Sequence, residues 1–218
     1  MPRPLFVTQP NGRDAGPPAR RARERANPGI SICCYAYATF NALHRLVPPP
    51  VGFAAAFPNT AAIDAFIRQN FCAGRNARMG GNMATVLNAL QAQGIGAGLQ
   101  LASWQSTLSA QQVFNRRARA MVFGVSFGAD RHWIFLDNAW QIGAAPNQQV
   151  LIHAIDQQNT GRDYTLLLDP GINVIGQTFD TCEAVTGTPM SPANYAALRA
   201  GPALAPRNYV INRVETLH

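Results

Sequence analysis

The chain changes character near residue 120, and this change constrains the fold more than any other feature of the sequence. Before it, apolar residues recur with helical spacing; after it, short apolar runs alternate with turns rich in Gly, Asn and Asp. Helices followed by strands indicate an α+β fold in which a helix packs across an antiparallel sheet. The predicted helices span residues 31–46, 60–71, 82–93 and 109–119. The predicted strands span residues 120–127, 132–136, 149–155, 164–168 and 209–213.

The beginning of the chain differs from the rest. Residues 1–26 are rich in Pro, Gly and Arg and short of large apolar side chains, as is typical of a disordered arm. Residues 27–218 have a suitable length for one folded domain. No apolar run is long enough to span a membrane, and the start lacks the apolar segment of a secretory signal peptide. If the protein is exported, we expect a route that needs no such signal, or export within a larger precursor.

All 18 basic residues are arginine, and the net charge is +7. A GC-rich genome accounts for this composition and for the heavy use of Ala, Gly and Pro. A functional alternative is a protein that acts inside a foreign cell, where absent lysines remove ubiquitin acceptor sites. Basic charge also suits nucleic-acid binding, but the arginines cluster between Arg13 and Arg25 and are otherwise scattered. Because no basic stripe is interleaved with aromatics, the sequence argues against a nucleic-acid partner.

The four cysteines, Cys33, Cys34, Cys72 and Cys182, form no CxxC pair and no Cys/His zinc spacing. The sequence therefore predicts no metal site. A disulfide such as Cys72–Cys182 stays open, but so few cysteines do not make a disulfide scaffold. A reducing compartment is the simpler expectation.

Cys34 is the candidate nucleophile. It follows the turn signal Pro28-Gly29 at the start of the first predicted helix, where unpaired N–H groups and the helix dipole favour a thiolate. Ala36 and Phe40 mark the apolar stripe that faces the core. Cys33 lies about 60° from this stripe and Cys34 about 160°, so Cys34 is the one that can face a cleft. The structural alternative is that both are small buried residues.

His153 and Asp169 are the candidate partners of this thiol. A thiolate catalyst needs an imidazole to carry its proton and an acceptor to orient the imidazole. His153 lies on one strand of a predicted hairpin and Asp169 follows the next strand, so the two side chains can become neighbours. His132 is the alternative histidine, with Asp156 or Asn138 as its acceptor. Either histidine could instead have a hydrogen-bonded structural role.

Three short motifs resemble bacterial cysteine proteases. Cys34-Tyr35-Ala36-Tyr37-Ala38 resembles the papain-type segment Cys-Trp-Ala-Phe-Ala. His153-Ala154-Ile155 and Leu168-Asp169-Pro170-Gly171 resemble the His-Ala-Ile and Phe-Asp-Pro-Asn motifs of the YopT/AvrPphB family of effector proteases. The resemblance, over residues 27–176, implies a papain-like fold with the nucleophile helix packed on a C-terminal antiparallel sheet. It also implies Cys34 as nucleophile, His153 as general base and acid, and Asp169 as the orienting carboxylate.

Two departures from the family pattern concern the nucleophile and the oxyanion hole. Papain-like enzymes carry a Gln six residues before the cysteine as an oxyanion donor, whereas this position holds Pro28. Asn27 is the nearest substitute for that donor. The Gly-x-Cys pattern becomes Ser31-Ile32-Cys33-Cys34, which keeps Cys33 as an alternative nucleophile.

The resemblance implies a thiol endopeptidase of effector or toxin type, a virulence hydrolase that needs no cofactor. Such an enzyme is secreted by a bacterium without a classical signal peptide and cleaves a protein in the cytoplasm of a host or competitor cell. An immunity protein or inhibitor is a further partner to expect. The same triad could instead support deamidation, transglutamination or acyl transfer. The alternative from another class is a non-enzymatic, arginine-rich adaptor or nucleic-acid-binding protein.

Overall fold

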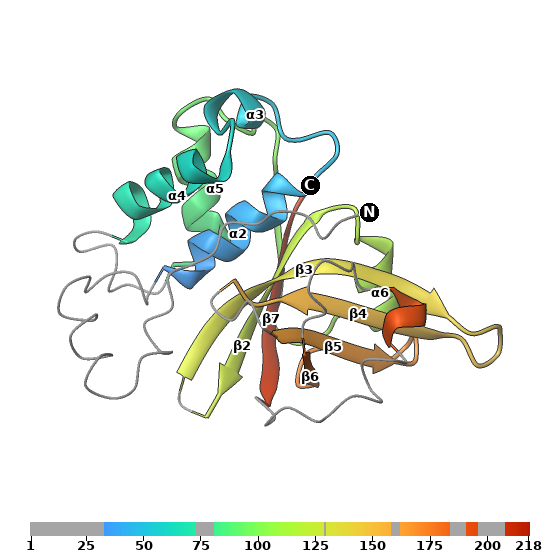
Figure 1. Ribbon diagram of the computed structural model, residues 1–218. Helices are drawn as coiled ribbons and strands as arrows, with labels where there is room; N and C mark the ends of the chain where they lie inside the picture. Colours follow the sequence, from blue (N-terminus) through green and yellow to red (C-terminus); the bar gives the residue numbers. More distant parts are fainter. Residues whose placement is uncertain (1–32, 73–80, 129, 158–161, 184–190, 196–207) are drawn as a thin grey trace.

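The strands of the second half close into a barrel (Figure 1). A computed structural model describes residues 33–72, 81–128, 130–157, 162–183, 191–195 and 208–218. Around the barrel the strand order is β7, β2, β3, β4, β5 and β6, and β6 pairs with β7 to complete the ring, while β1 lies outside it beside β7. All pairings are antiparallel. The strands are β1 (Leu101–Trp104), β2 (Ala120–Phe127), β3 (Asp130–Ile142), β4 (Gln149–Ile155), β5 (Arg162–Leu168), β6 (Thr178–Glu183) and β7 (Tyr209–Leu217).

The predicted papain-like α+β fold, with a helix across an antiparallel sheet, is wrong, because the sheet closes on itself. The sequence pattern predicted neither β1 nor β6, and β6 is the strand that closes the ring. β6 contains a single aromatic residue, Phe179, and no alternating apolar pattern. It pairs with β5 along most of its length and with β7 only at Thr178 and Phe179. Such a short pairing with a distant strand leaves no local signal in the sequence.

The four predicted helices are present, and a short additional helix lies between the first two. Their starts follow from capping side chains: Asn59 accepts a hydrogen bond from the backbone N–H of Ala62 at 2.9 Å. Asn82 and Ser109 each form a capping box with the residue three positions on. The helices are α2 (Cys34–His44), α3 (Phe53–Ala56), α4 (Thr60–Ile67), the π-helical turn η2 (Arg68–Cys72), α5 (Met83–Gln91) and α6 (Ala110–Asn115).

Two large apolar cores and a small third cluster around Leu151 share the strands of the barrel. Side chains alternate across a strand, so Val122 of β2 packs against the helices while its neighbour Phe123 points into the barrel. The outer core joins α2, α3, α4, η2 and α5, here called the helical layer, to the outside of β2 and β3. Figure 1 shows this layer on one side of the barrel, with α2 nearest the strands. The start of α2 therefore comes close to β3, the strand that carries His132.

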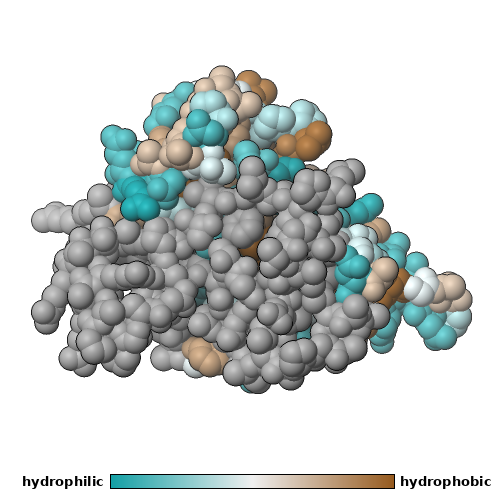
Figure 2. All heavy atoms as spheres, viewed as in Figure 1, coloured by the Kyte–Doolittle hydropathy of each residue, from teal (hydrophilic) through white to brown (hydrophobic). Residues whose placement is uncertain are grey.

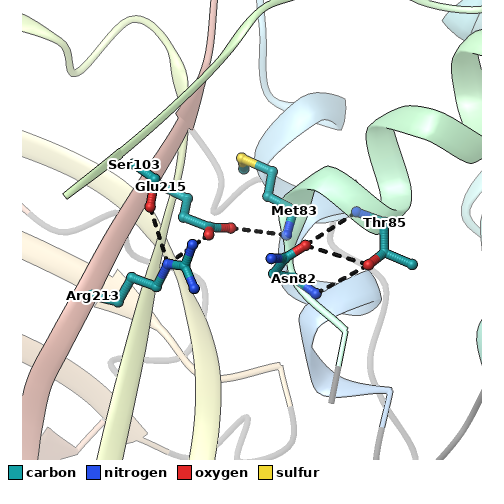
Figure 3. A network of polar contacts seen from close by, with 6 residues as sticks. All are labelled: Asn82, Met83, Thr85, Ser103, Arg213 and Glu215. Carbon is teal, nitrogen blue, oxygen red and sulfur yellow. Dashed lines mark hydrogen bonds and ion pairs between the residues drawn. The ribbon is translucent and has the colours of Figure 1, made fainter. Parts of the chain in front are cut away.

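A buried carboxylate links the helical layer to the last strand (Figure 3). Glu215 of β7 accepts a hydrogen bond from the backbone N–H of Met83, in the first turn of α5, at 2.9 Å. Burial raises the pKa of Glu215, and this N–H together with Arg213, 2.7 Å away, opposes that rise. Arg213 also donates to Ser103 of β1 at 3.0 Å. The negative charge therefore stabilises the N-terminus of α5 and fixes it to the barrel.

Large apolar side chains are mostly buried in the described part of the chain. The exposed exceptions there are Val47, Val51, Phe127 and Ile172. On the face drawn in Figure 2, the coloured surface of the helical layer mixes hydrophilic and hydrophobic residues, and hydrophobic atoms reach its outer rim. Among the described residues, no helix has the length and apolarity needed to cross a membrane.

Candidate functional site

Cys34 is the first residue of α2 and has a free thiol. Its neighbour Cys33 forms a disulfide with Cys72 at the end of η2, with a Cα–Cα distance of 5.4 Å. Cys33 is fully buried and Cys34 is also buried, with 7% of its surface exposed, so burial does not separate the two cysteines in the way the helical stripe predicted. While Cys33 stays in this disulfide it cannot act as a nucleophile. The structure thus leaves Cys34 as the candidate at this helix start.

His132 lies beside Cys34 and is oriented by a carboxylate. Its Nε2 is 2.8 Å from Oδ1 of Asp156, and both side chains are almost completely buried. Burial alone would lower the pKa of His132. Asp156, and Cys34 through a hydrogen bond and its charge, overcome this effect and raise the pKa of His132 to about 10. Imidazole, carboxylate and thiol therefore form one connected group.

The barrel explains how His132 and Asp156 meet. In β3, His132 lies two residues before Ile134, and Asp156 lies two residues after Ala154 of β4; both apolar residues line the barrel interior. Residues two apart share a face of a strand, so the histidine and the carboxylate lie on the inner face at one end of the barrel. The β3–β4 ladder ends at the pair Phe135 and Ile155, so His132 and Asp156 lie just beyond its last pair.

Tyr209 completes the surroundings of Asp156. Its hydroxyl donates to Oδ2 of Asp156 at 3.3 Å, so each carboxylate oxygen has a partner. The Tyr209 ring also lies 5.9 Å from the His132 ring and 4.9 Å from the Tyr164 ring, measured between centroids. Nothing local in the sequence predicts this residue, because only the closure of the barrel brings β7 next to the end of β4.

The predicted partners His153 and Asp169 lie elsewhere. His153 Nδ1 is 2.9 Å from Oδ2 of Asp137, and Asp137 Oδ1 is 2.8 Å from Nη1 of Arg45. Trp140 stacks on the imidazole. Asp169 accepts a hydrogen bond from Gln149 at 3.1 Å in an exposed position. The structure therefore does not bring Cys34, His153 and Asp169 together.

The register of the β4–β5 hairpin gives the reason. His153 pairs with Thr165, whereas Asp169 follows Leu168, which pairs with Val150. Asp169 therefore lies about four residues along the strand from His153, or roughly 13 Å. Strand alternation also turns His153 away from the barrel interior that Ile152 faces. Two residues on the strands of a hairpin are neighbours only if the register places them opposite each other. The register of β4 and β5 does not do so for His153 and Asp169.

Tyr35 borders the thiol on the helix side. Burial, and to a smaller extent the charge of Cys34, raise the pKa of Tyr35. Its ring makes an edge-on contact with Phe71, with centroids 6.0 Å apart, and lies directly against the backbone of Gly81. Asn27 and Pro28, which bear on the predicted oxyanion donor, are outside the described residues, as is the predicted arm 1–26.

The residues offer a nucleophile, a proton carrier and an orienting acceptor, which is the set that thiol-dependent acyl transfer requires. In the described part of the chain, no group of three or more His, Cys, Asp or Glu side chains could hold a metal ion. Comparisons with protein-family models, with curated proteins and with solved structures found no match for this chain.

Proposed function

We propose that the chain is a cysteine hydrolase of amide bonds, a protease in its simplest form, with Cys34 as nucleophile, His132 as acid and base, and Asp156 as orienting carboxylate. The observation that carries this proposal is the connected group of thiol, imidazole and carboxylate, with Cys34 at a helix N-terminus. His132 and Asp156 replace the sequence-based choice of His153 and Asp169, and they are the alternative that the sequence had left open.

The reaction begins with a protonated His132 beside a Cys34 thiolate, an arrangement favoured by the raised pKa of His132. The sulfur attacks the carbonyl carbon of the amide and forms a C–S bond. As the C–N bond breaks, His132 gives its proton to the leaving amine. Neutral His132 then takes a proton from water, whose oxygen attacks the thioester, and the released thiolate restores the starting state. Because first-turn amides of a helix can bind a developing oxyanion, we assign this role to the backbone N–H of Cys34.

The test uses the full chain and two variants, Cys34→Ala and His132→Ala. Each protein is incubated with a complex mixture of folded proteins, and new protein N-termini are identified by mass spectrometry. We expect the wild type to generate new N-termini that neither variant produces. A mass gain of about one dalton on glutamine side chains, or crosslinks without new N-termini, would assign the same acyl-enzyme to deamidation or transglutamination. Salt-sensitive nucleic-acid binding that survives Cys34→Ala, with no thiol-dependent product, would favour the non-enzymatic alternative.

Action as an effector or toxin on a protein of a host or competitor cell is part of this proposal. The Cys33–Cys72 disulfide supports a stage in an oxidising compartment, in contrast to the reducing compartment predicted from the cysteine count. Expression of the wild type and of Cys34→Ala in the cytoplasm and in the periplasm of a test bacterium separates the cases. We expect growth inhibition that depends on Cys34, and growth unaffected by the wild type in either compartment would contradict a toxin role.

A further inference from the structure

Gln157 joins the backbone segments that carry the thiol and the imidazole. This residue directly follows Asp156 and is completely buried. Its side-chain amide nitrogen donates to the carbonyl oxygen of Cys34 at 3.1 Å and to the carbonyl oxygen of Trp133 at 2.9 Å. Cys34 is the candidate nucleophile itself, and Trp133 is the residue after His132. One amide group therefore holds three chain segments, namely α2, β3 and the end of β4.

The side-chain hydrogen bonds of Gln157 lie just beyond the point where the β3–β4 backbone ladder ends. The last backbone pair on this side is Phe135 with Ile155, yet β3 continues to Trp133 and His132 and pairs there only with β2. Its edge toward β4 thus lacks ladder partners over the residues that carry the imidazole. The side chain of Gln157 supplies a donor to that edge and reaches α2 at the same time. A buried carbonyl oxygen that lacks a hydrogen-bond donor costs free energy. The two hydrogen bonds of Gln157 therefore stabilise the fold and also fix the positions of the segments that they join.

We infer that Gln157 is a positioning residue that sets the separation of the Cys34 thiol and the His132 imidazole. The inference rests on the proposed function of these two residues. α2 belongs to the helical layer and His132 to the barrel, so a change in how the two pack would alter the thiol–imidazole distance. Proton transfer between them needs hydrogen-bond contact, and a displacement of about 1 Å is enough to slow such a step strongly. Since Gln157 adjoins Asp156, the segment that orients the imidazole also holds the thiol.

The test compares Gln157→Met with Gln141→Met. Methionine has a similar length and volume to glutamine but no hydrogen-bond donor. Gln141 lies on β3 and donates to Gln111 of α6 at 2.9 Å, so its replacement makes the same chemical change away from the site. The readout is the second-order rate constant for alkylation of Cys34 by iodoacetamide across the neutral and alkaline range, located by peptide mass mapping. Circular dichroism follows folding and thermal unfolding of each variant.

We expect Gln157→Met to slow alkylation at neutral pH by roughly tenfold or more, and to make the rate rise with pH like that of an ordinary thiol. Gln141→Met should leave both the rate and the pH profile unchanged. If Gln157→Met does not fold, Gln157→Leu is a second variant that has no hydrogen-bond donor and adds no charge, and it should show the same slow alkylation. A folded variant with the wild-type rate and profile would overturn the inference. If neither Gln157 variant folds, the inference is also overturned, because the hydrogen bonds of Gln157 would then serve to hold the fold together. A wild-type rate no higher than that of His132→Ala would instead contradict the proposed function.

Discussion

The hydroxyl of Tyr209 donates a hydrogen bond to the carboxylate of Asp156 across 3.3 Å, although 53 residues separate the two along the chain. Tyr209 opens β7, and its pairing with Phe179 of β6 is part of the β6–β7 contact that completes the barrel. The orienting carboxylate of the candidate site therefore depends on closure of the barrel. Loss of that closure would loosen Asp156 and, through it, His132.

Tyr209→Phe tests this relationship. The variant keeps the ring that packs on Tyr164 and removes only the hydroxyl, so we expect a loss of about 1–2 kcal/mol in the free energy of unfolding, measured by urea denaturation. Alkylation of Cys34 should slow at the same time. Tyr37→Phe is the control, because it removes a hydroxyl that donates to Asp64 at 2.6 Å in the helical layer. It should lower stability without changing the pH profile of alkylation, and an equal effect on that profile would argue against a role for Tyr209 in the site.

His132→Ala and His153→Ala distinguish the two candidate histidines. We expect His132→Ala to abolish the enhanced alkylation of Cys34 and any catalytic activity, because the proton carrier is lost. His153→Ala removes a fully buried imidazole and leaves the partly buried Asp137 with one partner fewer, so it should lower the free energy of unfolding by about 2–4 kcal/mol. Its folded fraction should keep the wild-type reactivity at Cys34. The reverse pattern of reactivities would restore His153 as the catalytic histidine.

We expect the imidazole of His132 to titrate at a pH far above the ordinary range of a histidine. Its pKa is raised from 6.5 to about 10, and imidazole resonances in NMR spectra recorded against pH should show a midpoint in that direction. A pKa that is higher in the folded state means that protonation stabilises the fold fully below pH 6.5. This contribution fades as the pH rises through about 10. Asp156→Asn should move the midpoint down and flatten this pH dependence. A wild-type midpoint near 6.5 would contradict the close pairing with Asp156 and Cys34.

Gly81→Ala tests the support behind Tyr35. A methyl group at residue 81 would overlap the buried ring of Tyr35, which also contacts Phe71. We expect a loss of about 1–3 kcal/mol in the free energy of unfolding together with altered reactivity of the neighbouring Cys34. Gly171→Ala is the matched control, since a methyl group there meets no atom within 4 Å. Equal stability of the two variants in urea would show that the ring moves aside freely.

Local sequence patterns predicted most of the helices and strands, whereas contacts between residues far apart in the chain determine which residues form the candidate site. The apolar stripe of α2 predicted Cys33 on the core side and Cys34 toward a cleft; Cys33 does lie in the outer core, in its disulfide with Cys72, but Cys34 is buried as well. The choice of His153 failed at the level of register, because spacing along a hairpin does not say which residues face each other or which face they occupy.

Other parts of the site had no local signal at all. Tyr209 and Gln157 act through contacts with Asp156, Cys34 and Trp133, all of which come from separate elements. The partner of Cys72 was equally open, since cysteine spacing does not determine connectivity. These features follow from the closed barrel and the packing of the helical layer on it, neither of which a one-dimensional pattern contains.

During oxidation Cys72 can form a disulfide with either of two cysteines that are adjacent in the sequence, Cys33 and Cys34. Its pairing with Cys33 spans 39 residues, and pairing with Cys34 would change the loop by a single residue, which leaves the closure entropy essentially the same. Both cysteines are buried in the folded protein, and it is the folded geometry, with Cys33 beside Cys72 and Cys34 beside His132, that distinguishes the two. A chain oxidised before it folds therefore produces a mixture of disulfide isomers, and the isomer that ties up Cys34 has lost its nucleophile. The order of folding and oxidation thus determines what fraction of the molecules can react.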